Sequence, residues 1–159
     1  MKTDAVDACK LAENLGMSPQ EEGGLVKENH YPFEGPGRAG SGHAYYYFRP
    51  DVSTVFHTLD CDEYWVYHAG DGLEVWIIDP EGKLERRKFG TSDGAELCLY
   101  LKKGVAFAAR PLEQVGKGTL ISAITVPRFS YDGFHLLDQN QVIGLCPDAE
   151  AFFMSGRFS

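Results

Sequence analysis

Residues 56–78 read FHTLDCDEYWVYHAGDGLEVWII, and this stretch decides the fold. Aromatic and β-branched side chains fill two short runs, EYWVYHA at 63–69 and LEVWIID at 73–79, the last residue of which follows the stretch. Such residues favour strands, whereas glycine and aspartate, which stand between the runs, favour turns. The stretch therefore predicts two successive short strands.

The same pattern continues on both sides of this stretch. Six further runs are AYYYFR at 44–49, TVFHTL at 54–59, KLERRKFG at 83–90, LCLYLKK at 97–103, VAFAAR at 105–110 and TLISAITV at 119–126. Residues 79–83, DPEGK, predict a tight hairpin turn between two of the runs. Eight short runs with a spacing of about ten residues predict an all-β sandwich or barrel.

The two ends of the chain follow other patterns. Residues 4–15 place apolar side chains at spacings of three and four, which predicts an amphipathic helix with Asp4 as N-cap and Gly16 as its stop. The sequence LVKEN at residues 25–29 predicts a short strand. Residues 132–159 predict a short strand and a helical turn. No linker divides the chain, so we expect one domain over 1–159 with a barrel core over about 41–140.

Charge and cysteine content exclude several classes of partner. The 159 residues carry a formal net charge of −8, which disfavours nucleic acid and anionic membrane surfaces. No apolar run approaches the roughly 20 residues of a membrane span, and no signal peptide is recognisable at the start. Four separated cysteines, Cys9, Cys61, Cys98 and Cys146, suggest reduced thiols in a cytoplasmic protein.

Residues with fixed spacing mark a candidate site. They form the string Asp51-x5-His57-x-Leu59-x3-Glu63-x6-Gly70. This string resembles the first motif of cupin barrels, G-x5-H-x-H-x3-E-x6-G, with the first glycine and the second histidine replaced. Farther along, Gly104 and Phe107 resemble part of the second motif, with Phe107 in the place of its histidine. The resemblance implies a double-stranded β-helix, the jelly-roll barrel of the cupins, with a short N-terminal helix.

A narrower resemblance covers roughly residues 12–140. The chain is similar to the small single-domain cupins of the cupin-5 family, formerly a domain of unknown function. The stretches that carry it are Leu15-Gly16-Met17, Glu22-Gly23-Gly24, Tyr45, Phe56-His57, Asp62-Glu63-x-Trp65, Ala69-Gly70-Asp71, Pro80-x-Gly82-x-Leu84-Glu85 and Thr125-Val126-Pro127. Lys27 and Val66 depart from it, standing where the family commonly has arginine and histidine. The resemblance also implies a homodimer.

Strand geometry then predicts a pocket. In a strand over 62–68, Glu63, Trp65 and Tyr67 share one face, because side chains alternate along a strand. The resemblance implies that this face points into the barrel and that His57 and Phe107 point inward with it. We expect substrate contacts from Tyr46, Trp65, Phe107 and Tyr131. An aromatic cavity with one imidazole and one carboxylate suits a flat or ring-shaped organic ligand.

The polar groups of this pocket suggest acid–base chemistry. With Glu63 next to His57, the carboxylate would orient the imidazole and raise its pKa toward neutrality. A tyrosine such as Tyr67 or Tyr131 would donate the balancing proton. We therefore expect His57, Glu63 and Tyr67 to be catalytic. A satisfied buried polar pair without catalytic function is the simpler interpretation of the same two residues.

The resemblance also raises the question of a metal. Metal-binding cupins hold their ion with three histidines and a glutamate, and this chain keeps His57 and Glu63 alone of these four. Iron, manganese or zinc need at least three protein ligands, so we expect no cofactor. The alternative is a divalent metal on His57 and Glu63, completed by His43 or His135.

These observations predict a metal-independent isomerase, epimerase or cyclase that acts on a small, ring-containing organic molecule. The aromatic lining favours a polyketide or other specialised metabolite over a bare sugar. Two alternatives stay open: a metal-dependent, dioxygenase-like cupin, and a cupin that binds a small ligand without catalysis. The expected partners are a small-molecule substrate and a second copy of the chain, with no nucleic acid and no membrane.

Overall fold

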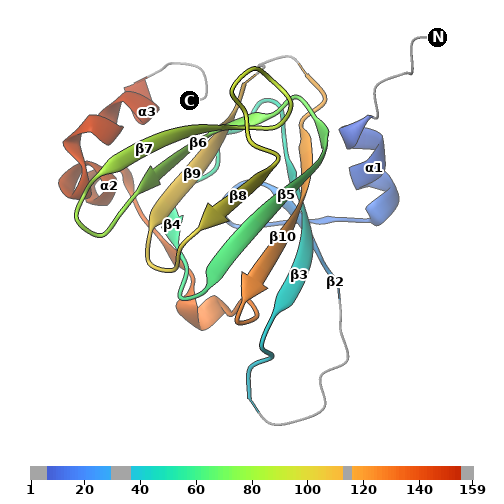
Figure 1. Cartoon of the computed structure of the whole chain (residues 1–159), viewed down its shortest axis with the longest axis horizontal. Helices are drawn as coiled ribbons and strands as arrows, with labels where there is room; N and C mark the ends of the chain where they lie inside the picture. Colours follow the sequence, from blue (N-terminus) through green and yellow to red (C-terminus); the bar gives the residue numbers. More distant parts are fainter. Residues whose placement is uncertain (1–6, 30–36, 113–115, 155–159) are drawn as a thin grey trace.

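The computed structural model describes residues 7–29, 37–112 and 116–154. Two antiparallel sheets pack face to face (Figure 1). The larger sheet has the order β1-β2-β3-β10-β5-β8, with β1 Ser18–Pro19, β2 Leu25–Asn29, β3 Gly42–Phe48, β10 Thr119–Val126, β5 Asp62–Gly70 and β8 Cys98–Leu101. The smaller sheet has the order β11-β4-β9-β6-β7, with β11 His135–Leu136, β4 His57–Thr58, β9 Ala106–Pro111, β6 Leu73–Ile78 and β7 Leu84–Phe89.

Each of the eight predicted runs contributes a strand, and the all-β expectation is confirmed. The hairpin turn between β6 and β7 also forms as expected. There the Asp79 carboxylate accepts hydrogen bonds from the backbone amides of Glu81 and Lys83, at 3.0 and 2.8 Å. β1 and β2 precede the expected barrel core of 41–140 and extend the larger sheet beyond it.

The order of the strands brings distant parts of the chain together. β10 lies between β3 and β5, so that Ser122 pairs with Tyr45 on one side and with Val66 on the other. The register between β10 and β5 shifts between Leu120 and Ile121. Such a bulge bends the strand locally and changes its twist. The interior wall of the larger sheet is thus built from segments that are far apart in sequence.

Apolar side chains from the inner faces of both sheets form the main core. Among its members are aromatic and aliphatic residues from seven strands: Phe48, Trp65, Leu73, Val75, Phe89, Leu99, Leu101, Phe107 and Ile121. Each is almost inaccessible to solvent. Burial of this kind, at about 25 cal/mol per Å² of apolar surface, is the dominant favourable term in folding.

Helices cover the outer faces of the two sheets. α1, Ala8–Leu15, packs on the larger sheet, and α2, Gln139–Leu145, with α3, Glu150–Met154, covers the smaller one (Figure 1). The expected N-terminal helix is present, but it begins at Ala8 with Asp7 as its N-cap, because the Asp7 side chain accepts hydrogen bonds from the amides of Cys9 and Lys10; Asp4, the expected N-cap, lies outside the described residues. Gly16 ends α1 in the left-handed conformation, at φ 64°.

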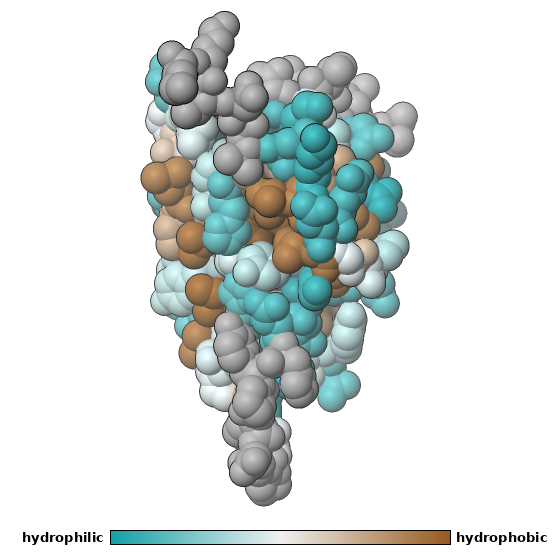
Figure 2. Space-filling model, turned by 90° about the vertical axis from the view of Figure 1, so that its right-hand side faces the viewer, coloured by the Kyte–Doolittle hydropathy of each residue, from teal (hydrophilic) through white to brown (hydrophobic). Residues whose placement is uncertain are grey.

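The side of the molecule that carries α1 has a mixed surface, on which hydrophobic groups are interspersed with hydrophilic ones (Figure 2). None of the helices in the described ranges is long and apolar enough to cross a bilayer. The four cysteines are free thiols, of which Cys61 and Cys146 are buried.

Candidate functional site

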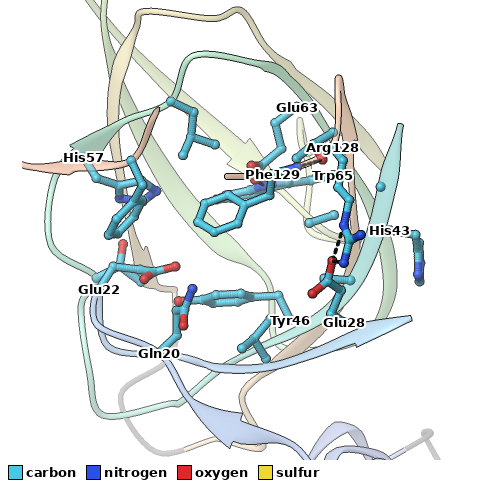
Figure 3. Close-up of a pocket in the computed structure, with 18 of the residues that line it drawn as sticks. Gln20, Glu22, Glu28, His43, Tyr46, His57, Glu63, Trp65, Arg128 and Phe129 are labelled. Atoms are coloured by element: carbon cyan, nitrogen blue, oxygen red, sulfur yellow. Dashed lines mark hydrogen bonds and ion pairs between the residues drawn. The ribbon is translucent and has the colours of Figure 1, made fainter. Parts of the chain in front are cut away.

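A cavity of about 130 Å³ lies between the two sheets (Figure 3). Its walls are mainly aromatic, and the rings come from both sheets and from the segment after β10: Tyr46, Phe48, Trp65, Phe107, Phe129, Tyr131 and Phe134. Its polar side chains are Gln20, Glu22, Glu28, Thr54, His57, Glu63, Thr125 and Arg128. Cavities of roughly 150 Å³ with apolar walls can take up one benzene ring, so this space suits one small ring.

The backbone of Val55 fixes two polar residues, Glu22 and His57, on one wall of the cavity. Its amide donates a 2.8 Å hydrogen bond to the backbone carbonyl of Glu22. Its carbonyl accepts a 2.8 Å hydrogen bond from Nδ1 of His57. The segment before β4 therefore holds Glu22 and His57 side by side, although they are 35 positions apart in the sequence.

The hydrogen bond to Val55 also decides the tautomer of the neutral His57 ring. A carbonyl can only accept, so Nδ1 carries the proton and Nε2 remains as an acceptor. Burial lowers the pKa of His57 to about 4, despite the opposing effect of the Val55 carbonyl. The expected rise of this pKa toward neutrality is wrong, because desolvation of the imidazolium outweighs its hydrogen bond. His57 is a neutral acceptor at physiological pH.

Glu63 faces the cavity from the opposite sheet. Its carboxylate accepts a hydrogen bond from the indole Nε1 of Trp65, two residues along the same strand. Burial raises its pKa to about 7; the Trp65 hydrogen bond opposes this rise, and the charge of Glu22 adds to it. The predicted contact in which Glu63 orients His57 is absent from the described residues, where the imidazole bonds Val55 and the carboxylate bonds Trp65. A carboxyl group that titrates near neutrality can both donate and accept a proton.

Glu22 is a cavity residue that the sequence interpretation did not select. Only 6% of its surface is exposed, and its Oε2 has no hydrogen-bond partner in the part of the chain that the structure describes. Burial raises its pKa above the ordinary value, while hydrogen bonds that include one from Tyr46 oppose the rise. The string Glu22-Gly23-Gly24, which is one of the stretches that resemble the cupin-5 family, was the sequence feature that could have indicated a site residue here.

The structure places the predicted substrate contacts and one of the two predicted proton donors, Tyr131, at the cavity, where the Tyr131 hydroxyl donates a 3.2 Å hydrogen bond to Oε1 of Gln20. Tyr46, Trp65, Phe107 and Tyr131 all line the cavity. Tyr67 does not: its hydroxyl donates a 2.7 Å hydrogen bond to the carbonyl of Gly70, and its ring packs against Phe89. Tyr67 shares the inward face of β5 as expected, but it lies farther along the strand, so it is not available as the proton donor at this site. The Tyr46 hydroxyl, which accepts a 3.1 Å hydrogen bond from the Gly24 amide, is the phenol beside Glu22.

Neither of the histidines named as additional metal ligands completes a set with His57 and Glu63. His43 belongs to the cavity lining, but its imidazole is turned away from the interior, with Nε2 2.7 Å from the Ser122 hydroxyl and Nδ1 2.8 Å from Asn29 (Figure 3). His135 is exposed on β11. Among the described residues, no three His, Cys, Asp or Glu side chains are placed to hold one metal ion. The cavity side chains therefore do not match the ligand set that a tightly held metal requires.

Close packing at Gly24 holds Tyr46 against Glu22. A Cβ atom at position 24 would lie 2.2 Å from the Tyr46 ring, well inside contact distance. We expect Gly24→Ala to displace this phenol and to lower the free energy of unfolding by about 2 kcal/mol. Gly40→Ala is the matched control, because nothing lies within 4 Å of a Cβ there. Urea denaturation measures both, and equal stability of the two variants would contradict the packing argument.

Comparison with solved structures supports the fold. The chain aligns with a protein from Shewanella oneidensis at 25% identity and a TM-score of 0.82, covering 97% of this chain and 98% of that one. A hypothetical protein from Leishmania major gives 24% identity and a TM-score of 0.80, with 94% and 98% covered. Oxalate decarboxylase from Bacillus subtilis shares the fold at 19% identity and a TM-score of 0.59, with 87% of this chain and 36% of that one covered.

The family itself is identified by the sequence match. The model of the Cupin_5 family, described as cupin superfamily (DUF985), matches residues 9–137. This range includes both sheets, the segment that carries Glu22 and all of the residues that line the cavity. The chain belongs to the Cupin_5 (DUF985) family of the cupin superfamily.

Proposed function

We propose that this protein binds a small, ring-containing organic molecule in the barrel cavity and isomerises, epimerises or cyclises it by proton transfer. The observation that carries the proposal is the position of Glu63, a buried carboxyl group with a pKa of about 7 on the wall of a ring-sized aromatic cavity. A general acid or base works best when its pKa lies near the operating pH.

Glu63 and His57, which face the cavity from opposite sheets, then have different roles. Glu63 takes a proton from a carbon or hydroxyl of the ring compound and returns it at another position, so that no external oxidant or reductant is needed. His57 accepts a hydrogen bond from the substrate through Nε2 and fixes its orientation, since its pKa of about 4 makes it a weak base at neutral pH. The aromatic walls exclude water from the reacting atoms.

Solvent deuterium provides the test. Ring-containing metabolites that raise the thermal stability of the protein are incubated with it in D₂O and then examined by mass spectrometry. We expect at least one to gain deuterium on carbon in the presence of the wild-type protein. In Glu63→Gln, the exchange rate should fall by about 10²–10⁴-fold, the usual contribution of one acid–base group.

A matched control separates this role from a general effect of the substitution. Glu85 is exposed on β7, and Glu85→Gln should exchange at the wild-type rate. Exchange that persists in Glu63→Gln would reject Glu63 as the proton carrier. Ring compounds that bind to the wild type but never exchange or convert would favour a protein that binds its ligand without catalysis.

A further inference from the structure

The unpartnered oxygen of Glu22 is an unused polar group inside the cavity. Figure 3 shows its carboxylate turned toward the interior, between the imidazole of His57 and the phenol of Tyr46. Glu22 is almost fully buried, and its Oε2 has no hydrogen-bond partner within the described ranges. A buried acceptor without a partner is unfavourable, and more so when it is charged, so a bound donor at this point would be stabilised.

The charged side chains that line the cavity are mostly acidic. Arg128 is the cation among the described lining residues, and it is already paired with Glu28 through contacts of 2.7 and 2.5 Å. Both members of this pair are partly exposed, which places them at the rim. Deeper in the cavity stand two carboxyl groups, Glu22 and Glu63, with the neutral imidazole of His57. An anionic ligand would find no free cation there.

The rings around these carboxyl groups also favour positive charge. Tyr46, Trp65, Phe107, Phe129 and Phe134 line the same cavity. An aromatic face attracts a cation within about 6 Å of its centroid, most strongly for tryptophan, and desolvation strengthens the effect. Carboxylates and aromatic faces together form the type of site that recognises organic ammonium groups.

We propose that the cavity selects an organic cation, a small ring compound whose ammonium or protonated ring nitrogen donates a hydrogen bond to the Glu22 carboxylate. This inference rests on the proposed function, in which the cavity binds a small ring compound, and it adds the charge and polarity of that compound. Glu22 is the binding group, and Glu63 remains the group that transfers the proton.

Three probes of similar size and different charge test the inference: benzylammonium, benzyl alcohol and benzoate. Isothermal titration calorimetry at neutral pH is expected to give benzylammonium at least about tenfold tighter binding than benzyl alcohol, with benzoate weakest. In Glu22→Gln, the affinity for benzylammonium should fall by about 10–100-fold, while that for benzyl alcohol changes little. Glu81→Gln, an exposed change in the β6–β7 turn, is the matched control and should keep the wild-type order.

The outcomes distinguish this inference from the function on which it rests. If benzyl alcohol or benzoate binds as tightly as benzylammonium to the wild type, the selection of a cation is wrong while the cavity remains a ring-binding site. If Glu22→Gln weakens all probes equally, Glu22 is not the ammonium partner. If none of the three binds, both the inference and the ring-binding function are rejected. The wild-type comparison stands even if Glu22→Gln does not fold.

Discussion

Glu63→Gln is expected to stabilise the protein at alkaline pH by about 3 kcal/mol and to leave its stability nearly unchanged at pH 4. Burial raises the pKa of Glu63 from 4.5 to about 7, and each pKa unit corresponds to about 1.4 kcal/mol. The Gln side chain keeps an oxygen for the Trp65 indole and has no proton to lose. The variant therefore removes the cost of ionising a buried carboxyl group.

The direction of this effect follows from proton linkage. Above pH 4.5 an unfolded glutamate loses its proton, whereas folded Glu63 keeps it until about pH 7. The unfolded state thus binds fewer protons than the folded state in this interval, and the wild type loses stability as pH rises through it. His57, with its pKa lowered to about 4, acts in the opposite direction between pH 6.5 and 4. Because both proteins contain His57, its contribution cancels in the difference between them.

Urea denaturation across a series of buffers from pH 4 to pH 9 measures the difference in the free energy of unfolding. Glu85→Gln, on an exposed position of β7, is the matched control and should stay within about 0.5 kcal/mol of the wild type throughout. A difference between Glu63→Gln and the wild type that does not change with pH would show that Glu63 has an ordinary pKa. The role of Glu63 as a neutral-pH proton carrier would then lose its basis.

The strands could be predicted because their signal is local. Runs such as EYWVYHA carry the alternation and the aromatic content that pack a sheet, and the turn at 79–83 carries its own aspartate and glycine. The family resemblance added the barrel and the inward direction of His57, Glu63 and Phe107. All three line the cavity, as expected.

The contacts inside the site could not be predicted, because they depend on which strands become neighbours. His57 and Glu63 are six residues apart, but β4 belongs to the smaller sheet and β5 to the larger one. Trp65 lies on the same face of β5 as Glu63, so its indole reaches the carboxylate first. Glu22 enters through the segment between β1 and β2, and a hydrogen bond to Val55 holds it there. Nothing in the local sequence around position 22 indicates that contact.

Metal content gives the second large expected effect. Leu59→His combined with Phe107→His places two imidazoles in the cavity that His57 and Glu63 already line. We expect the purified, untagged double variant to retain about one equivalent of zinc or nickel after dialysis, because four donors of these types satisfy such an ion. The wild type, purified in the same way, should retain only traces. Inductively coupled plasma mass spectrometry measures both, with circular dichroism to check that each variant folds.

His57→Ala provides the control for both proteins. In the double variant it removes one of the four ligands and should release the metal, whereas in the wild type it should leave the metal content at the level of traces. A stoichiometric metal in the wild type that disappears in His57→Ala would overturn the proton-transfer proposal and make His57 and Glu63 ligands.

The packing of Phe107 explains why the wild type is expected to lack a tight metal. Its ring centroid lies 4.3 Å from that of His57 and 5.8 Å from that of Trp65. Position 107, where the second cupin motif has a histidine that can bind a metal, is thus filled by a ring that forms part of the cavity wall. No small movement of Phe107 supplies a donor atom, and Leu59 likewise offers none. Leucine at position 59 and phenylalanine at position 107 weaken a metal site and enlarge the apolar surface available to an organic ring. Leu59→His combined with Phe107→His should therefore raise the metal content and weaken the binding of ring compounds.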